Sequence, residues 1–148
     1  MFWNEKCLLE LTHHNLFEST EHRNRFRELL DCYYEAPFFT KGICKCMYLA
    51  SWDELHFMQI LSILNEMMIS DSAALQKMRE NGEALSRQAE GYEENIYALS
   101  LSFLTNSYYE LPDFSRIDPE TAHIIRRSIL AASFIDDLPD PHADQTWQ

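Results

Sequence analysis

The sequence contains few residues that interrupt helices. Of its 148 residues only three are glycine and five are proline, and the glycines stand singly at positions 42, 82 and 91. Long stretches of the chain therefore have no helix breaker. A Gly-rich phosphate loop is excluded, and neither GxSxG nor HExxH occurs. The composition predicts an all-α protein and argues against familiar nucleotide and hydrolase chemistry.

Basic charge and long hydrophobic runs are also scarce. Twelve lysines and arginines stand against 24 acidic residues, which gives a net charge of −12 and opposes binding to nucleic acid or to an anionic membrane. No stretch reaches the roughly 18 uncharged apolar residues of a transmembrane helix. Glu5 and Glu10 interrupt what would be the apolar region of a signal peptide. We therefore expect a cytoplasmic protein that binds neither nucleic acid nor membranes.

The cysteines lack the spacing of common metal and redox sites. Cys7, Cys32, Cys44 and Cys46 include no CxxC pair, and in a reducing compartment they are expected to remain thiols. Buried free cysteines are the expected outcome.

The apolar residues that are present, 46% of the chain, suffice for one domain. We predict a single all-α domain over residues 1–138 and a flexible C-terminal tail over 139–148. Hydrophobic periodicity and capping residues predict helices over 3–14, 20–35, 41–50, 52–69, about 71–82, 83–110 and 118–136. Segments 41–50 and 52–69 form either two helices or one bent helix, and the 83–110 helix is either continuous or broken at Gly91. Ser19, a Ser51/Glu54 capping box, and Asp118-Pro119 mark helix starts. The apolar segment 52–69 is expected to be the core element.

One segment of the sequence nearly repeats. LLDCYYEAPFFTK at 29–41 returns as LTNSYYELPDFSR at 104–116, an offset of 75 residues, with six of thirteen positions identical. This internal pseudo-repeat predicts a bundle of five or six helices built on two similar helical hairpins. In both hairpins the first helix is expected to end in Tyr-Tyr-Glu-x-Pro.

The repeated turn has two interpretations. It can simply terminate and pack two helices, with Thr40 or Ser115 as a cap, or it can form a twinned recognition surface. The residues of that candidate interaction surface are Tyr33, Tyr34, Glu35, Phe39, Lys41, Tyr108, Tyr109, Glu110, Phe114 and Arg116.

The alternative to an interaction surface is a metal-binding site. Carboxylate and histidine recur at the i, i+3 spacing by which di-iron carboxylate bundles present ligands. The candidate ligands are Glu10, His13, His14, Asp53, His56, Glu120 and His123. The repeat does not reproduce these residues. Glu120 lies in the first turn of a predicted helix, where the helix dipole favours acidic side chains.

The sequence contains no complete catalytic set. We therefore expect a non-enzymatic protein-interaction or regulatory module without a cofactor, which forms a homodimer or binds another protein. The alternative is a transition-metal-binding helical bundle with hydrolase or oxidase activity. A third reading, an acidic decoy for a nucleic-acid-binding protein, is disfavoured because arginines interrupt the negative charge at positions 23, 25, 27, 126 and 127.

Overall fold

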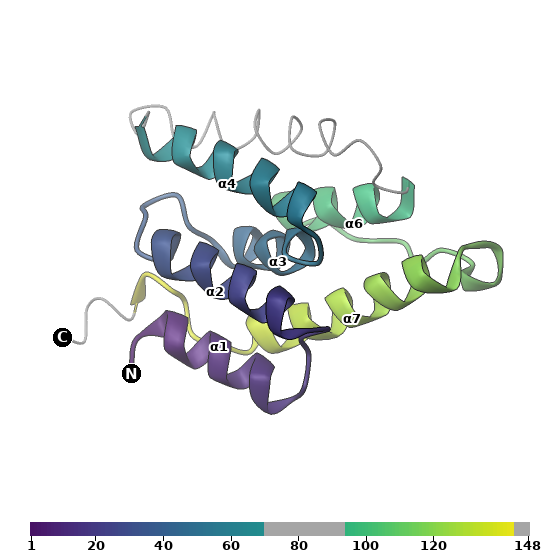
Figure 1. Ribbon diagram of the computed structural model, residues 1–148, viewed down its shortest axis with the longest axis horizontal. Coiled ribbons are helices and arrows are strands. Elements are labelled where there is room, and N and C mark those ends of the chain that lie inside the picture. Colours follow the sequence, from purple (N-terminus) through teal and green to yellow (C-terminus); the bar gives the residue numbers. More distant parts are fainter. Residues whose placement is uncertain (70–93, 144–148) are drawn as a thin grey trace.

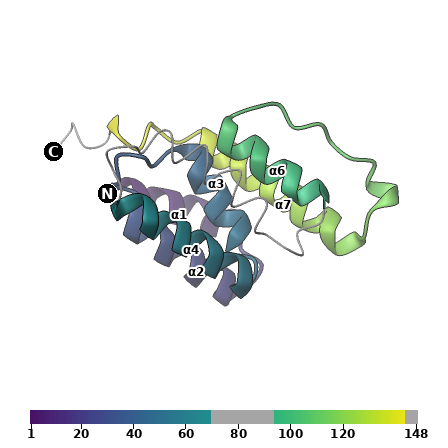
Figure 2. The ribbon, with the colours of Figure 1, turned by 90° about the horizontal axis from the view of Figure 1, so that it is seen from above.

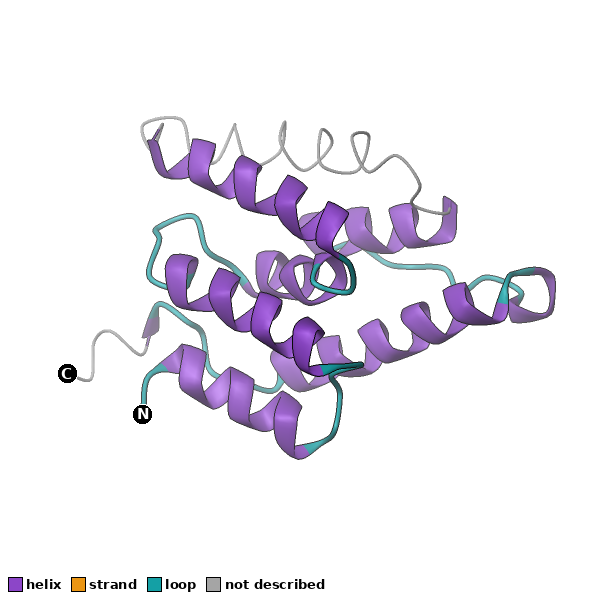
Figure 3. Ribbon diagram, in the orientation of Figure 1, coloured by secondary structure: helices purple, strands orange, loops and turns teal. Residues whose placement is uncertain are grey.

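The computed structural model describes residues 1–69 and 94–143, and in these ranges the chain is helical without any strand (Figure 3). The α-helices are α1 (Trp3–His13), α2 (Thr20–Tyr33), α3 (Lys41–Ala50), α4 (Glu54–Ile69), α6 (Glu94–Thr105) and α7 (Pro119–Asp136), and the 3₁₀ turn η2 spans Phe114–Arg116. The all-α prediction is confirmed. Among the described helices, none combines the length and apolar character that crossing a membrane requires.

Side-chain caps set three of the helix starts. The side chain of Ser19 accepts a hydrogen bond from the His22 N–H at 3.0 Å, and Thr40 accepts one from Ile43 at 3.1 Å. Asp118 caps α7 in the same way, with Pro119 following it at the first helical position. Each cap satisfies an otherwise unpaired N–H, so the predicted starts of α2 and α7 are confirmed.

The start of α4 corrects the predicted Ser51/Glu54 capping box. Asp53 is the cap, because its Oδ1 accepts a hydrogen bond from the His56 N–H at 2.8 Å. Ser51 is fully buried, and its hydroxyl donates to the Met47 carbonyl at 2.6 Å in the last turn of α3. The serine therefore closes one helix and is not available to open the next.

The end of α6 corrects the predicted helix over 83–110. The helix stops at Thr105, Asn106 adopts a left-handed conformation with φ 52°, and the Ser107 N–H bonds back to the Ser102 carbonyl at 3.1 Å. Asparagine tolerates this conformation, so it ends a helix much as glycine does. The second Tyr-Tyr pair is thus in a loop, not at a helix end. The predicted helix over 71–82 and the start of the 83–110 helix lie outside the described residues.

Helix α3 lies at the centre of the molecule. It packs against α2, α4, α6 and α7 (Figures 1 and 2), and every residue from Ile43 to Ala50 is buried. Helix α4, expected to be the core element, exposes Leu55, Met58 and Ile69. Helix α3 is enclosed because four helices pack around it, and it approaches α6 so closely at Gly42 that a Cβ there would collide with the α6 backbone.

Residues 139–142 are attached to the helices. The Trp3 indole Nε1 donates to the Pro139 carbonyl at 2.7 Å, and His142 Nε2 donates to the Phe39 carbonyl at 2.7 Å. Trp3 and Phe39 also pack edge to face, with ring centroids 5.5 Å apart. The predicted flexible tail therefore begins with a segment that contacts both α1 and the α2–α3 turn.

Candidate functional site

Two adjoining cavities lie between α3, α6 and α7, with volumes of about 480 and 430 Å³. Both are lined by Lys45, Phe103, Asn106 and Asp136, so they form one continuous depression, which we call the groove. The first cavity extends toward the start of α3 and residues 140–142, and the second toward the loop after α6. The groove therefore spans the ends of three helices and two connecting segments.

The groove has apolar walls and a charged centre. Lys45 is only 9% exposed, and its Nζ lies 2.7 Å from Asp136 Oδ1 and 5.8 Å from the centroid of the Phe103 ring. The Asp136 side chain remains 57% exposed. A buried ammonium is tolerated because the carboxylate pairs with it. The carboxylate is therefore the part of this ion pair that faces an incoming molecule.

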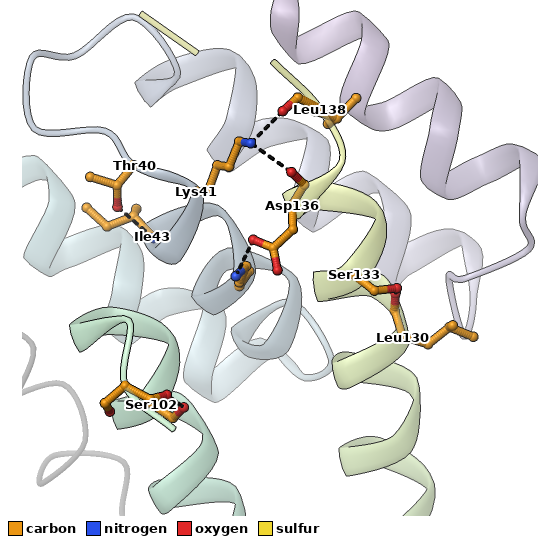
Figure 4. Close-up of polar contacts among 10 residues, drawn as sticks. Thr40, Lys41, Ile43, Ser102, Leu130, Ser133, Asp136 and Leu138 are labelled. Atoms are coloured by element: carbon orange, nitrogen blue, oxygen red, sulfur yellow. Dashed lines mark hydrogen bonds and ion pairs between the residues drawn. The ribbon is translucent and has the colours of Figure 1, made fainter. Parts of the chain in front are cut away.

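Lys41 fixes the end of α7 at the rim of the groove (Figure 4). Its Nζ donates to the main-chain carbonyls of Asp136, at 2.9 Å, and Leu138. The last carbonyls of a helix lack intrahelical partners and carry the negative end of its dipole, so a lysine is a suitable cap. One residue at the start of α3 thus holds the end of α7 in place.

The first repeated turn contributes two of its candidate residues to the groove. Phe39 and Lys41 line the first cavity. Tyr33 is buried and hydrogen-bonds to α4, so it serves packing. The Tyr34 hydroxyl donates to Glu35 at 2.8 Å, and burial together with this hydrogen bond raises the pKa of Tyr34 to about 12. In this turn, Phe39 and Lys41 therefore line the groove, whereas Tyr34 and Glu35 contact each other.

The second repeated turn contributes one candidate residue. Tyr109 lines the second cavity, whereas Tyr108 is 90% exposed and Glu110 is also exposed. The Arg126 guanidinium of α7 lies 4.2 Å from the centroid of the Phe114 ring. Arg116 Nε lies 3.5 Å from Asp113 Oδ2. The two turns are therefore not equivalent patches. They form parts of different walls of the groove.

Three carboxylate–histidine pairs have the i, i+3 spacing, and in one of them, Asp53/His56, the two side chains contact each other. His56 Nδ1 lies 2.6 Å from Asp53 Oδ2. Burial raises the pKa of Asp53, but hydrogen bonds from the His56 side chain and backbone outweigh it, so the net pKa is lowered. The pair sits at the start of α4, where Asp53 is also the helix cap. The Asp53–His56 contact therefore stabilises the start of α4.

In the other two i, i+3 pairs, Glu10/His13 and Glu120/His123, the carboxylate and the histidine do not contact each other. Glu10 pairs with His14 at 3.1 Å and not with His13, and His123 pairs with Glu18 of another segment at 3.0 Å and not with Glu120. Ring packing accompanies both contacts: the His14 ring stacks on Phe134 with centroids 4.0 Å apart, and the His123 ring lies edge to face with Trp52 at 6.1 Å. His13 and Glu120 are exposed. Across residues 1–69 and 94–143, no three histidine, cysteine or acidic side chains come together as a metal site.

A buried histidine lies between α2 and the end of α3. His22 Nε2 donates to the Tyr48 carbonyl at 2.9 Å, while Nδ1 accepts from the Glu18 N–H at 3.1 Å. Its ring contacts Phe17, Tyr48 and Trp52. Burial lowers the pKa of His22 to about 4, so the ring is neutral at physiological pH. Both ring nitrogens are used, and the residue is structural.

The sequence prediction missed the residues at the centre of the groove. Lys45 and Asp136 belong to neither the repeated turn nor the histidine pairs. The sequence feature that indicates this site is Lys45, because it is the single charged residue in the apolar segment from Gly42 to Ala50. A charge inside an otherwise buried stretch requires a partner, and the sequence does not identify which of 24 acids supplies it.

Comparison with known proteins gives no match: no family model fits the sequence, and neither a curated protein nor a solved structure is significantly similar to it.

Proposed function

We propose that this protein is a non-enzymatic interaction module whose groove binds a basic, partly apolar segment of another protein. The observation that carries the proposal is the continuity of the two cavities around the Lys45–Asp136 ion pair. A depression that spans three helix ends is long enough for several residues of an extended chain.

Charge supports a basic occupant. The chain carries a net charge of −12, which accelerates encounter with a positively charged partner and disfavours a second copy of itself. At the centre of the groove, the half-exposed Asp136 carboxylate can accept hydrogen bonds from a guanidinium while it keeps Lys45 as its buried partner. Asp140 adds a second carboxylate at the rim of the first cavity.

Apolar contacts support an occupant that is not purely charged. Leu104 lines the first cavity, Leu111 and Ile129 line the second, and Leu111 is 60% exposed. Interfaces with this anatomy combine an apolar centre with a polar rim. We therefore expect the bound segment to alternate basic and apolar side chains.

The groove chemistry favours binding over catalysis. Three cationic or titratable side chains that line its first cavity already have partners: Lys45 pairs with Asp136, Lys41 donates to the Asp136 carbonyl, and His142 donates to the Phe39 carbonyl. A catalytic base would need to reach a substrate proton or an activated nucleophile. These groups instead hold the walls of the groove in place.

We propose further that the repeated sequences are the traces of one duplicated hairpin. The first turn supplies Phe39 and Lys41 to the groove, and the second supplies Tyr109. Divergence after duplication would explain why one copy ends a helix and the other forms a loop. On this proposal both copies were retained because each forms a wall of the binding surface.

A selection of peptides from a random display library tests the proposed function. We expect enriched peptides to contain arginine or lysine next to apolar residues. Ser133→Trp places a large side chain at an exposed position of the second cavity and should reduce the affinity at least about tenfold, or 1.4 kcal/mol. The matched control is Ser62→Trp, at an exposed position on α4, which should leave binding unchanged.

Two results would contradict the proposal. Peptides that bind equally well to both tryptophan variants would place the binding surface outside the groove. A sedimentation experiment in which the unmodified protein is a dimer, and Ser133→Trp makes it a monomer, would identify a second copy as the occupant in place of a basic partner.

A further inference from the structure

Two buried thiols from different helices lie next to each other. Cys7 on α1 and Cys44 on α3 are both 0% exposed, and their sulfur atoms are 3.8 Å apart. The residues are 37 positions apart in sequence, so the fold and not local chain geometry brings them together. A contact between two thiols is a precondition for a covalent bond between them.

We propose that Cys7 and Cys44 form an oxidisable dithiol, at which hydrogen peroxide produces a disulfide that links α1 to α3. A disulfide bond is about 2 Å long, so the sulfurs must approach by roughly 2 Å, which a small rotation of the two side chains can supply. This inference is independent of the proposed binding function, because neither cysteine lines the groove.

The chemistry balances with peroxide as the oxidant. The Cys7 sulfur, as thiolate, attacks one peroxide oxygen, the O–O bond breaks, and the departing hydroxide takes a proton to become water. The product is a sulfenic acid on Cys7. The Cys44 sulfur then attacks the Cys7 sulfur and displaces the hydroxyl group, which leaves as a second water with the Cys44 proton. Two thiols are oxidised by two electrons, and one peroxide is reduced to two waters.

The surroundings of the pair favour Cys44 as the resolving thiol. Burial raises the pKa of Cys44 well above its usual value, and the hydrogen bond with Cys7 raises it further. Cys44 therefore retains its proton and can donate it to the Cys7 sulfur. Such a thiol reacts slowly with peroxide itself, but it is already in position to attack a sulfenic acid on its neighbour.

The other two cysteines are placed differently. Cys32 is exposed on α2, and Cys46 Sγ lies 3.5 Å from the Ser100 carbonyl, to which it donates. Burial raises the pKa of Cys46 to about 12. Among the four cysteines, the pair at Cys7 and Cys44 is thus the one arranged for an intramolecular bond.

Access to the pair depends on α1. This helix buries Trp3, Cys7 and Leu11 on a single face, so its local opening would expose Cys7 without disrupting α3. Helix α3 carries Lys41 and Lys45 toward the groove, and α1 lies on another side of it. Oxidation would therefore fix α1 to the helix that forms the floor of the groove.

The test uses the full chain in a Cys32→Ser background, which removes exposed-thiol cross-linking between copies. The reduced protein is incubated with hydrogen peroxide, denatured and alkylated, and its intact mass and peptide map are recorded. We expect the loss of two alkylatable thiols, a mass decrease of two hydrogens, and a linked peptide that contains Cys7 and Cys44. Dithiothreitol should restore both thiols.

Variants separate this pair from other outcomes. The Cys46→Ser variant should still form the Cys7–Cys44 disulfide. The Cys7→Ser and Cys7→Ala variants should instead leave Cys44 fully alkylatable. The proposal is overturned if peroxide leaves both Cys7 and Cys44 alkylatable, if it converts Cys7 to a sulfinic acid, or if the linked peptide joins Cys44 to Cys46. Because the decisive measurement is made with Cys7 and Cys44 intact, it does not depend on the folding of any Cys7 variant.

Discussion

The two sides of α3 differ in how completely they are covered. Toward α2, Tyr48 packs among His22, Phe26 and Trp52, and its hydroxyl hydrogen-bonds to the Leu16 carbonyl. Toward α6 and α7, the same helix presents Lys45 to the groove. The covered side contains aromatic rings in mutual contact, and the open side contains an ion pair and space for a ligand. Stability and binding are therefore assigned to different surroundings of one helix.

The largest expected effect contrasts two phenylalanines on these sides. Phe26 is 0% exposed in the aromatic cluster, and we expect Phe26→Ala to lower the free energy of unfolding by about 4 kcal/mol. Phe103 borders the groove, so part of the space left by Phe103→Ala already adjoins solvent, and a loss of about 2 kcal/mol is expected. Urea denaturation measures both. Equal losses would contradict the contrast.

The covered side should also make stability depend on pH. The folded pKa of His22, about 4, lies below its ordinary value of 6.5, so the unfolded chain binds the proton first as pH falls. This contribution is fully present above pH 6.5 and is lost as pH falls toward 4. Between pH 7.5 and pH 5 it amounts to about 2 kcal/mol.

His22→Gln is the matched variant for this pH dependence. Glutamine can still donate to the Tyr48 carbonyl but does not titrate. Urea denaturation at the two pH values should show that the variant loses about 2 kcal/mol less than the unmodified chain. Identical losses would mean that His22 is not the group responsible.

The contact between α3 and α6 is the next target. In Gly42→Ala the added Cβ meets the Phe103 carbonyl, a backbone atom that cannot rotate away, and we expect a loss of about 2 kcal/mol. Ser62→Ala on the exposed face of α4 should change stability by less than about 0.5 kcal/mol. A stable Gly42→Ala protein would show that α6 is free to move relative to α3.

The smallest expected effect tests the ion pair in the groove. Asp136→Asn removes the charged partner of the buried Lys45 and should cost about 1 kcal/mol, since Asp136 itself is half-exposed. Asp137→Asn is the matched control, because it removes an exposed carboxylate at the same end of α7. Removing a negative charge there stabilises the helix dipole in both variants, so this contribution cancels in their difference. Thermal denaturation of both measures the difference. Equal melting temperatures would mean that the ion pair adds no stability.

The sequence predicts local structure well because the signals are local. Ser19, Thr40 and Asp118 mark helix starts through hydrogen bonds to residues three positions away, and the structure confirms each. The end of α6 was missed because an apolar pattern continues past Asn106, whereas the helix is ended by the backbone conformation of that one residue.

Tertiary roles could not be predicted in the same way. Segment 52–69 is more apolar than α3 and is expected at the centre, yet α3 lies there, packed against four helices and in close contact with α6 at Gly42. The groove depends on Lys45 meeting Asp136, which lies 91 residues away, and no periodicity reports such a contact. Spacing alone also does not reveal that His14 contacts Glu10 and that His123 contacts Glu18.

The most direct test of the groove as the binding surface is an NMR titration of the isotope-labelled protein with a selected basic peptide. Binding in the groove predicts that the backbone amide shifts concentrate in the start of α3, the end of α6, the end of α7, and Asp140 and His142. Shifts concentrated instead around His22 and Phe26, on the covered side of α3, would contradict it.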